Sequence, residues 1–309
     1  MKLEGALLSL TFWMVLLASA SAAQTQEPPK IDARIVALNC AAELATMGSS
    51  RPVALRSSRD VGRALSEGDQ IRCIGDGYLE LFVCEEKKRV NSSQGWFPIP
   101  PLPAKPPFCR IGEALRKYGV PGGTRAGGSL ILWPYDGSTV NPETFVIRWV
   151  PVQEKIELAI RVAGKNVTVW GPVKEDGTIG LLKPDSISAI LMAYRSQSEQ
   201  SDLILSLSLR EGTKWEDAHF SVLTSQQEHD LTAELSSWAT WANAVALHLG
   251  RAYSFTHFRL FVEAADEYDS ALRGAPESPY LLEEAIEMNR LAGKNDRVQE
   301  LQRLLKARE

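Results

Sequence analysis

Histidine and cysteine, the side chains that most often bind metal ions or act as nucleophiles, are scarce in this sequence. Each occurs four times in 309 residues. The histidines, which show no metal-ligand spacing, are His219, His229, His248 and His257. No C-x-x-C pair is present, which excludes the usual zinc-ribbon and thioredoxin-like motifs. We therefore expect neither a metal ion nor a cofactor.

Motifs of known catalytic machinery are also missing. The sequence contains no G-x-S-x-G nucleophile elbow and no H-E-x-x-H metal-binding helix. The glycine-rich stretch 122–129 has Gly128 where a phosphate-binding loop requires lysine. The acidic run Asp266–Asp269 is interpreted as the solvated face of a helix rather than as a catalytic pair of carboxylates. The sequence thus predicts a protein that is not an enzyme.

An excess of positive charge is missing as well. The 34 lysine and arginine residues are outnumbered by 38 aspartate and glutamate residues, which leaves a formal net charge of −4. No basic stripe interleaved with aromatic side chains occurs, so we expect no nucleic-acid partner. The hydrophobic fraction of 44% and the charged fraction of 23% are those of an ordinary globular protein. A chain of this length is expected to form two or three domains.

Long apolar runs are absent except at the N-terminus. There, Lys2 precedes an apolar stretch and then the small residues A-S-A-S-A-A. This order predicts a signal peptide over residues 1–23, with cleavage after Ala22 or Ala23. An uncleaved anchor is the alternative, because residues 6–23 are almost long enough to cross a bilayer. We expect a periplasmic or secreted protein without a stable membrane span in its mature chain.

The cysteines are few but even in number, which predicts disulfide bonds in an exported chain. The candidates are Cys40, Cys73, Cys84 and Cys109. Four cysteines permit three pairings, and the sequence leaves the choice among them open.

Residues 31–97 are expected to form an N-terminal all-β domain that contains these disulfides. Two strand-like runs flank a turn at residues 75–77 and predict a β-hairpin stabilised by disulfides. In the second run, apolar side chains alternate over residues 79–83 while Glu80 lies on the other face. This alternation is typical of a half-buried strand.

The middle of the chain changes composition twice. Residues 98–129 are rich in proline and glycine, with six prolines from Pro98 to Pro107, and predict an extended linker. Over residues 130–224, apolar and polar side chains alternate in several short runs separated by turn residues. This pattern predicts an antiparallel β-sandwich, with Trp149 in its core.

Residues 225–309 are expected to be helical and carry 14 acidic residues against 9 lysine and arginine residues. Ser225 followed by Glu228 predicts a capping box, and the first helix is expected to reach about Leu249. The predicted fold class is therefore a multidomain β plus α protein. It comprises an N-terminal all-β domain, an antiparallel β-sandwich and a C-terminal helical repeat.

The helical segment resembles the tetratricopeptide repeat family. The L-G-x-x-Y arrangement of a first repeat helix is matched by Leu249, Gly250 and Tyr253. The second helix and its end are matched by Ala264, Tyr268, Ala271 and Pro276. Small residues at these positions let two helices approach closely while tyrosine fills the space between them. The resemblance implies a short helical solenoid over 225–309; a generic helical bundle is the alternative.

The two β domains also resemble known families. Residues 132–152 have the order of proline, turn, strand and tryptophan found in fibronectin type III and immunoglobulin-like sandwiches. Gly68, Asp69 and Ile71, followed by the strand at 79–83, resemble the FecR-type domain of ferric citrate regulators. These resemblances imply folds rather than functions.

Together these features predict an exported, non-catalytic protein that acts in the cell envelope as a protein–protein interaction partner or scaffold. Helical repeats bind proteins on an exposed face, so we expect a protein partner at Asn243, His248 and Arg251 of the first repeat helix. The alternative is an envelope sensor that binds a small molecule or glycan through the FecR-like domain. In that case Trp96 and Phe97 would line the site.

Overall fold

The structure is a computed structural model that describes residues 33–56, 59–83, 86–101, 130–135, 137–150, 156–162, 165–173, 180–182, 188, 191–192, 203–209, 215–241 and 243–308. All of them belong to one compact unit. The predicted signal peptide, most of the predicted linker, Cys84 and Cys109 lie outside these ranges. Within them, every helix is too short or too polar to cross a membrane.

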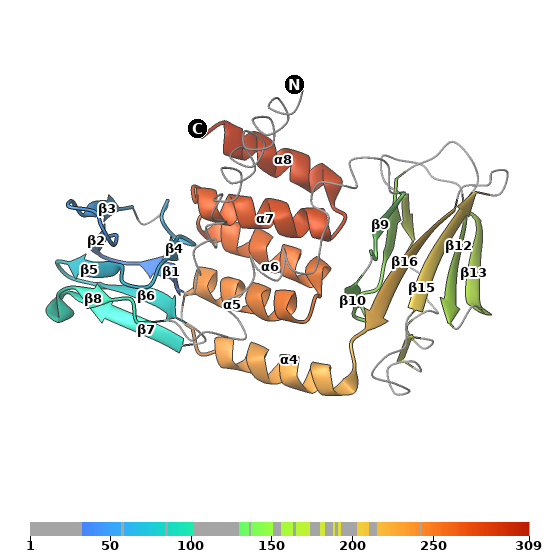
Figure 1. Cartoon of the computed structure of the whole chain (residues 1–309), viewed down its shortest axis with the longest axis horizontal. Helices are drawn as coiled ribbons and strands as arrows, with labels where there is room; N and C mark the ends of the chain where they lie inside the picture. The colour runs from blue at the N-terminus through green and yellow to red at the C-terminus, as the bar shows by residue number, and fades with distance from the viewer. Residues whose placement is uncertain are drawn as a thin grey trace, which may run out of the picture. The chain divides into compact units, whose positions relative to one another are not determined.

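The N-terminal β domain consists of two four-stranded antiparallel sheets with the orders β4-β1-β6-β7 and β3-β2-β5-β8 (Figure 1). The strands are β1 Ala33–Leu38, β2 Ala41–Ala45, β3 Val53–Leu55, β4 Ala64–Leu65, β5 Gln70–Ile74, β6 Tyr78–Val83, β7 Glu86–Asn91 and β8 Phe97–Pro98. A core of buried residues from both sheets, including Leu44, Ile71 and Leu81, holds them together. Ile99 belongs to this core, so the domain extends into the predicted linker.

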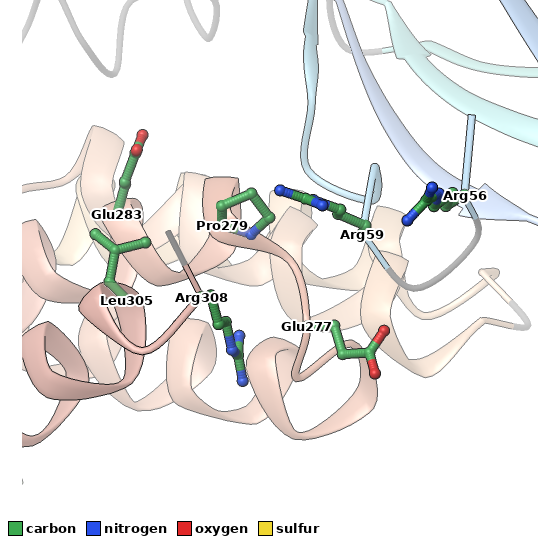
Figure 2. Close-up of a pocket in the computed structure, with 7 residues that line it drawn as sticks. All are labelled: Arg56, Arg59, Glu277, Pro279, Glu283, Leu305 and Arg308. Carbon is green, nitrogen blue, oxygen red and sulfur yellow. The ribbon is translucent and has the colours of Figure 1, made fainter. Parts of the chain in front are cut away.

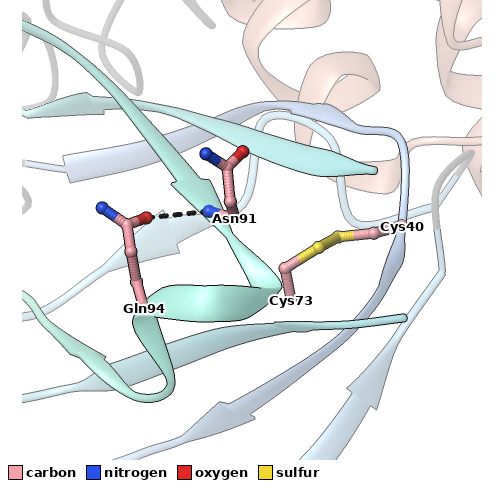
Figure 3. The surroundings of a disulfide bond; sticks show 4 residues. All are labelled: Cys40, Cys73, Asn91 and Gln94. Atoms are coloured by element: carbon pink, nitrogen blue, oxygen red, sulfur yellow. Dashed lines mark hydrogen bonds between the residues drawn. A yellow bond between two sulfur atoms is a disulfide. The ribbon is translucent and has the colours of Figure 1, made fainter. Parts of the chain in front are cut away.

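The predicted β-hairpin is wrong, because β5 and β6 follow one another in the chain but belong to different sheets. The turn at residues 75–77 carries the chain from one sheet to the other. Gly77 permits this corner: its φ is +114°, and a Cβ there would lie 2.1 Å from the carbonyl oxygen of Asn39. The Cys40–Cys73 disulfide joins the start of β2 to β5 (Figure 3), which confirms a disulfide in this domain.

Strand β6 is buried on both faces, so the predicted half-exposed strand is also wrong. The carboxylate of Glu80 is fully buried, where Lys87 and Arg89 of β7 pair with it at 3.2 and 2.6 Å. Phe82 lies 5.1 Å from Trp238 between ring centroids. Because helices cover the second face, sequence alternation alone underestimated how much of this strand is buried.

A β-sandwich-like pair of sheets follows, with the orders β10-β16-β15-β12-β13 and β14-β11-β9. The strands are β9 Ile131–Trp133, β10 Ser138–Val140, β11 Ile147–Trp149, β12 Ile156–Val162, β13 Lys165–Val173, β14 Gly180–Leu182, β15 Leu203–Leu209 and β16 Trp215–Val222. All pairs are antiparallel except β10 with β16, which is parallel. Trp149 is 1% exposed, which confirms its predicted place in the core.

Five helices form the C-terminal part, and each packs on the next along the chain (Figure 1). They are α4 Ser225–Trp238, α5 Ala244–His257, α6 Phe261–Gly274, α7 Pro279–Leu291 and α8 Asn295–Lys306. The capping box at the start of α4 is formed by Thr224 and Gln227, one residue before the predicted pair. The predicted first helix is in fact two helices, because the chain breaks after Trp238 and Asn243 caps α5.

The helices contact both the N-terminal β domain and the sandwich. The hydroxyl of Ser278, at the start of α7, donates a 2.5 Å hydrogen bond to the carbonyl oxygen of Val61. A guanidinium nitrogen of Arg148 in β11 donates a 3.0 Å bond to the carbonyl oxygen of Ala292, after α7. One hydrophobic core also includes residues of the β domain, the sandwich and the helices. The chain is therefore a mixed β plus α protein whose parts share buried surface.

Candidate functional site

The three predicted partner-binding residues lie on α5 and occupy two different environments. Asn243 is the N-cap of α5, where its Oδ1 accepts a 3.1 Å hydrogen bond from the backbone nitrogen of Ala246. This bond satisfies one of the free amide groups at the helix start. Asn243 therefore has a structural task in addition to any role in binding.

His248 and Arg251 meet at one carboxylate. Nδ1 of His248 lies 2.6 Å from one oxygen of Glu267 in α6, and a guanidinium nitrogen of Arg251 lies 2.9 Å from the other. The side chains of His248 and Arg251 remain 30% and 38% exposed, whereas that of Glu267 is 11% exposed. We call Asn243, His248, Arg251 and Glu267 the α5–α6 cluster.

Sequence reasoning missed Glu267 because it stands within the acidic run Asp266–Asp269, which was interpreted as a solvated face. That interpretation holds for Asp266, which is exposed, but not for its neighbours. Glu267 is buried, and Asp269 is largely covered by its ion pair with Arg297 of α8. Helical periodicity offers a signal, since residue 267 lies one position from the buried Tyr268 and three from the buried Ala264.

A cavity of about 530 Å³ lies between the loop that follows β3 and the helices α7 and α8 (Figure 2). We call it the arginine cavity. Its lining residues are Arg56, Arg59, Glu277, Pro279, Glu283, Leu305 and Arg308. Among the described residues, none supplies a carboxylate that pairs with the guanidinium groups of these three arginines. Sequence reasoning missed this site, since its residues come from segments about 220 to 250 positions apart, as Arg56 and Arg308 show.

A third set of polar side chains is buried between the β domain and the helices. Arg34 of β1 pairs with Glu284 of α7, and its guanidinium lies 5.6 Å from the ring centroid of Tyr253. Burial raises the pKa of the Glu284 carboxyl, although the attraction of Arg34 opposes this effect. The pair connects the β domain to the helices, so we assign it to the architecture.

Of the two residues that the alternative hypothesis places in a ligand site, Phe97 begins β8, the edge strand of the sheet β3-β2-β5-β8, and Trp96 directly precedes it. The guanidinium of Arg72 stacks 4.4 Å from the Trp96 ring centroid and pairs with Glu43 at 2.6 Å. Phe97 packs against the core between the sheets. Trp96 is therefore already engaged by a cation within the domain.

The residues described in the structure contain no group of three histidine, cysteine, aspartate or glutamate side chains placed to hold a metal ion. No known family's sequence profile matches the chain, and no curated protein is significantly similar to it. The two polar sites with exposed side chains, the α5–α6 cluster and the arginine cavity, are therefore the candidates for binding a partner or ligand.

Proposed function

We propose that this protein is an exported, non-catalytic interaction or scaffold protein of the cell envelope that binds a protein partner at the α5–α6 cluster. The single observation that carries the proposal is that His248 and Arg251 share one carboxylate. A guanidinium has five N–H donors, and Glu267 does not use them all. Arg251 therefore retains donors, and exposed surface, for a carboxylate or carbonyl group of a partner.

Helix spacing supports a tetratricopeptide-like repeat as the scaffold for this surface. The α7 helix begins 35 residues after α5, at Pro279 against Ala244. The α8 helix begins 34 residues after α6, at Asn295 against Phe261. A repeat of this length, built as two helices and a turn, is the mark of the tetratricopeptide family. The fibronectin-like and FecR-like assignments of the β domains belong to the same proposal.

Export is supported by the disulfide, because such bonds persist in oxidising compartments such as the periplasm. The predicted signal peptide is consistent with that location, and we propose a periplasmic or secreted protein. The alternative function, a sensor that binds a small molecule or glycan through the β domain, differs in where the ligand binds.

The test compares full-length proteins in affinity purification from the envelope fraction of the source cell. We expect Arg251→Glu to lose the partner, because the change places a negative charge beside Glu267 and repels acidic groups. Arg303→Glu is the control, since Arg303 is an exposed arginine on α8 outside the cluster. If the same partner protein is recovered in equal amounts with the Arg251→Glu variant and with the Arg303→Glu variant, the proposal is refuted. A truncation before α4 is unsuitable, because it would uncover Phe82.

A further inference from the structure

The arginine cavity brings together cations from two parts of the chain. Arg56 and Arg59 belong to the loop after β3, whereas Arg308 follows α8 (Figure 2). Like charges around one cavity repel each other, and solvent alone screens this repulsion only in part. Arginines that share a cavity, and that form no ion pair with a carboxylate among the described residues, are therefore well suited to bind an anion.

A buried carboxylate bonds to the backbone beside these cations. Asp60 is 8% exposed, and its Oδ2 accepts a 2.8 Å hydrogen bond from the backbone nitrogen of Arg56. Its Oδ1 accepts a 2.9 Å bond from the guanidinium of Arg63. The backbone nitrogens of Arg59 and Asp60 also donate to the carbonyl oxygen of Arg56, at 3.1 and 2.9 Å, so the backbone at Arg56 and Arg59 is held in place while Asp60 bonds to neither of their guanidinium groups. Binding groups whose backbone is already fixed lose less conformational entropy when a ligand binds.

The remaining lining residues narrow the chemistry of the ligand. Glu277 and Glu283 disfavour a compact polyanion, and the carboxylate of Glu283 can accept hydrogen bonds from hydroxyl groups. Leu305 and Pro279 provide an apolar wall for carbon atoms. The volume of about 530 Å³ falls in the usual range for small-molecule sites.

We propose that the arginine cavity binds a small hydroxylated organic anion, such as a sugar acid or a sugar phosphate. The carboxylate or phosphate group pairs with guanidinium groups among Arg56, Arg59 and Arg308, and a hydroxyl group donates to Glu283. Such a ligand contacts the β domain and α8 at once, so its binding stabilises the contact between them. This site is separate from the α5–α6 cluster and does not depend on the proposed function.

The experiment is isothermal titration of the full-length protein with glucuronate and with glycerol phosphate. Glucose and glycerol are the matched neutral compounds, and inorganic phosphate is the anion without hydroxyl-bearing carbon. We expect at least one of the two organic anions to bind and its neutral counterpart not to bind. The preferred probe then identifies the anionic group as carboxylate or phosphate.

The variants locate the site. Arg59→Glu and Arg308→Glu change exposed residues, so both proteins are expected to fold. Each should weaken binding about tenfold or more, the effect of losing a charge-assisted hydrogen bond. Arg303→Glu on α8 makes the same change of charge outside the cavity and should leave affinity within about twofold, as expected for a screened surface charge.

Four outcomes with these compounds and variants overturn the proposal, and a fifth concerns a peptide. They are no binding of either organic anion, equal binding of glucose and glucuronate, an equal loss with Arg303→Glu, and inorganic phosphate binding as tightly as glycerol phosphate. A tetraglutamate peptide that binds more tightly than either small anion would also overturn it, because the cavity would then be a peptide site. Binding of a protein partner at Arg251 is measured in a different experiment from binding of an anion in the arginine cavity. Failure of one proposal therefore leaves the other intact.

Discussion

At the scale of single residues, Gly77 shows how one backbone position determines the corner between two sheets. Gly77→Ala should lower the free energy of unfolding by more than about 2 kcal/mol, because it adds a left-handed backbone penalty to a clash with the Asn39 carbonyl. Gly75→Ala is the matched control, with φ +74° but no atom within 4 Å of an added Cβ. Urea denaturation measures the free energy of unfolding of both variants. An equal loss of stability in the two variants would contradict the predicted clash with Asn39.

Glu263 at the start of α6 is a titratable residue that contacts the sandwich. Its Oε1 accepts a 2.5 Å hydrogen bond from the hydroxyl of Thr144. Burial raises the pKa of the Glu263 carboxyl, and the Thr144 bond opposes this rise without cancelling it. The folded protein therefore holds this proton more tightly than the unfolded chain does.

The sign of the resulting pH dependence follows from that difference. Stability from Glu263 is fully present below the ordinary glutamate pKa and is lost as the pH rises through the raised pKa. We expect Glu263→Gln to gain stability relative to the unaltered protein as the pH rises through this window. Glu143→Gln, an exposed change beside Thr144, should show a smaller change. Thermal unfolding at several pH values tests this, and parallel curves for the unaltered protein and Glu263→Gln would contradict it.

At the scale of elements, α4 and α5 pack closely because Gly250 has no side chain. A Cβ at Gly250 would lie 2.2 Å from the indole ring of Trp238, which is 5% exposed. Phe82 and Tyr253 surround the same region, with ring centroids 5.5 Å apart. The indole of Trp238 also lies 5.4 Å from the ring of Trp241, so other aromatic rings pack around it.

Gly250→Ala should destabilise the protein by about 1–3 kcal/mol, the usual cost of overpacking, although alanine favours helix formation. Gly274→Ala at the end of α6 is the control, because the nearest atom is a methyl group of Val245 on a half-buried side chain. A Cβ there would lie 2.4 Å from that methyl group, so Val245 must shift, and we expect the control to lose less stability than Gly250→Ala. Differential scanning calorimetry compares the two, and a stabilised Gly250→Ala would show that α4 can move.

At the scale of the whole molecule, one hydrophobic core joins parts that the sequence separates. Val36, Val61 and Phe82 of the β domain belong to the same core as Trp238 and Tyr253 of the helices. Because this surface is buried only when both parts are folded, we expect the β domain and the helices to unfold together.

Phe82→Ala tests this coupling. Loss of a buried phenylalanine costs about 3–5 kcal/mol, and here the loss falls on the contact between β6 and α4. Two signals are followed as denaturant is added: the helical circular dichroism and the reduction of the Cys40–Cys73 disulfide by added reductant. Both should change at the same denaturant concentration in the unaltered protein and at different concentrations in Phe82→Ala. Leu81→Ala removes a buried side chain from the core between the two sheets of the β domain. It should lower stability, but the two transitions should still coincide. Separate transitions in the unaltered protein would contradict the coupling.

The sequence predicted much of the fold but little of the candidate sites. Strand and helix regions follow from periodicity, which is local, and the burial of Trp149 follows from residue size. Gly250 was predicted to let the two helices of one repeat approach, but in the structure it faces Trp238 of α4. The shared carboxylate of Glu267 and the three arginines of the cavity join different elements. The residue pattern of a single segment does not predict contacts between side chains from distant segments.

By itself, the sequence determined the mixed β plus α class and the presence of a disulfide, because composition and alternation act over a few neighbouring residues. Only the tertiary structure decided that Cys40 pairs with Cys73, that β5 and β6 separate into two sheets, and that Phe82 is covered. The physical reason is that a strand's pairing and the burial of its second face depend on segments far away in the chain.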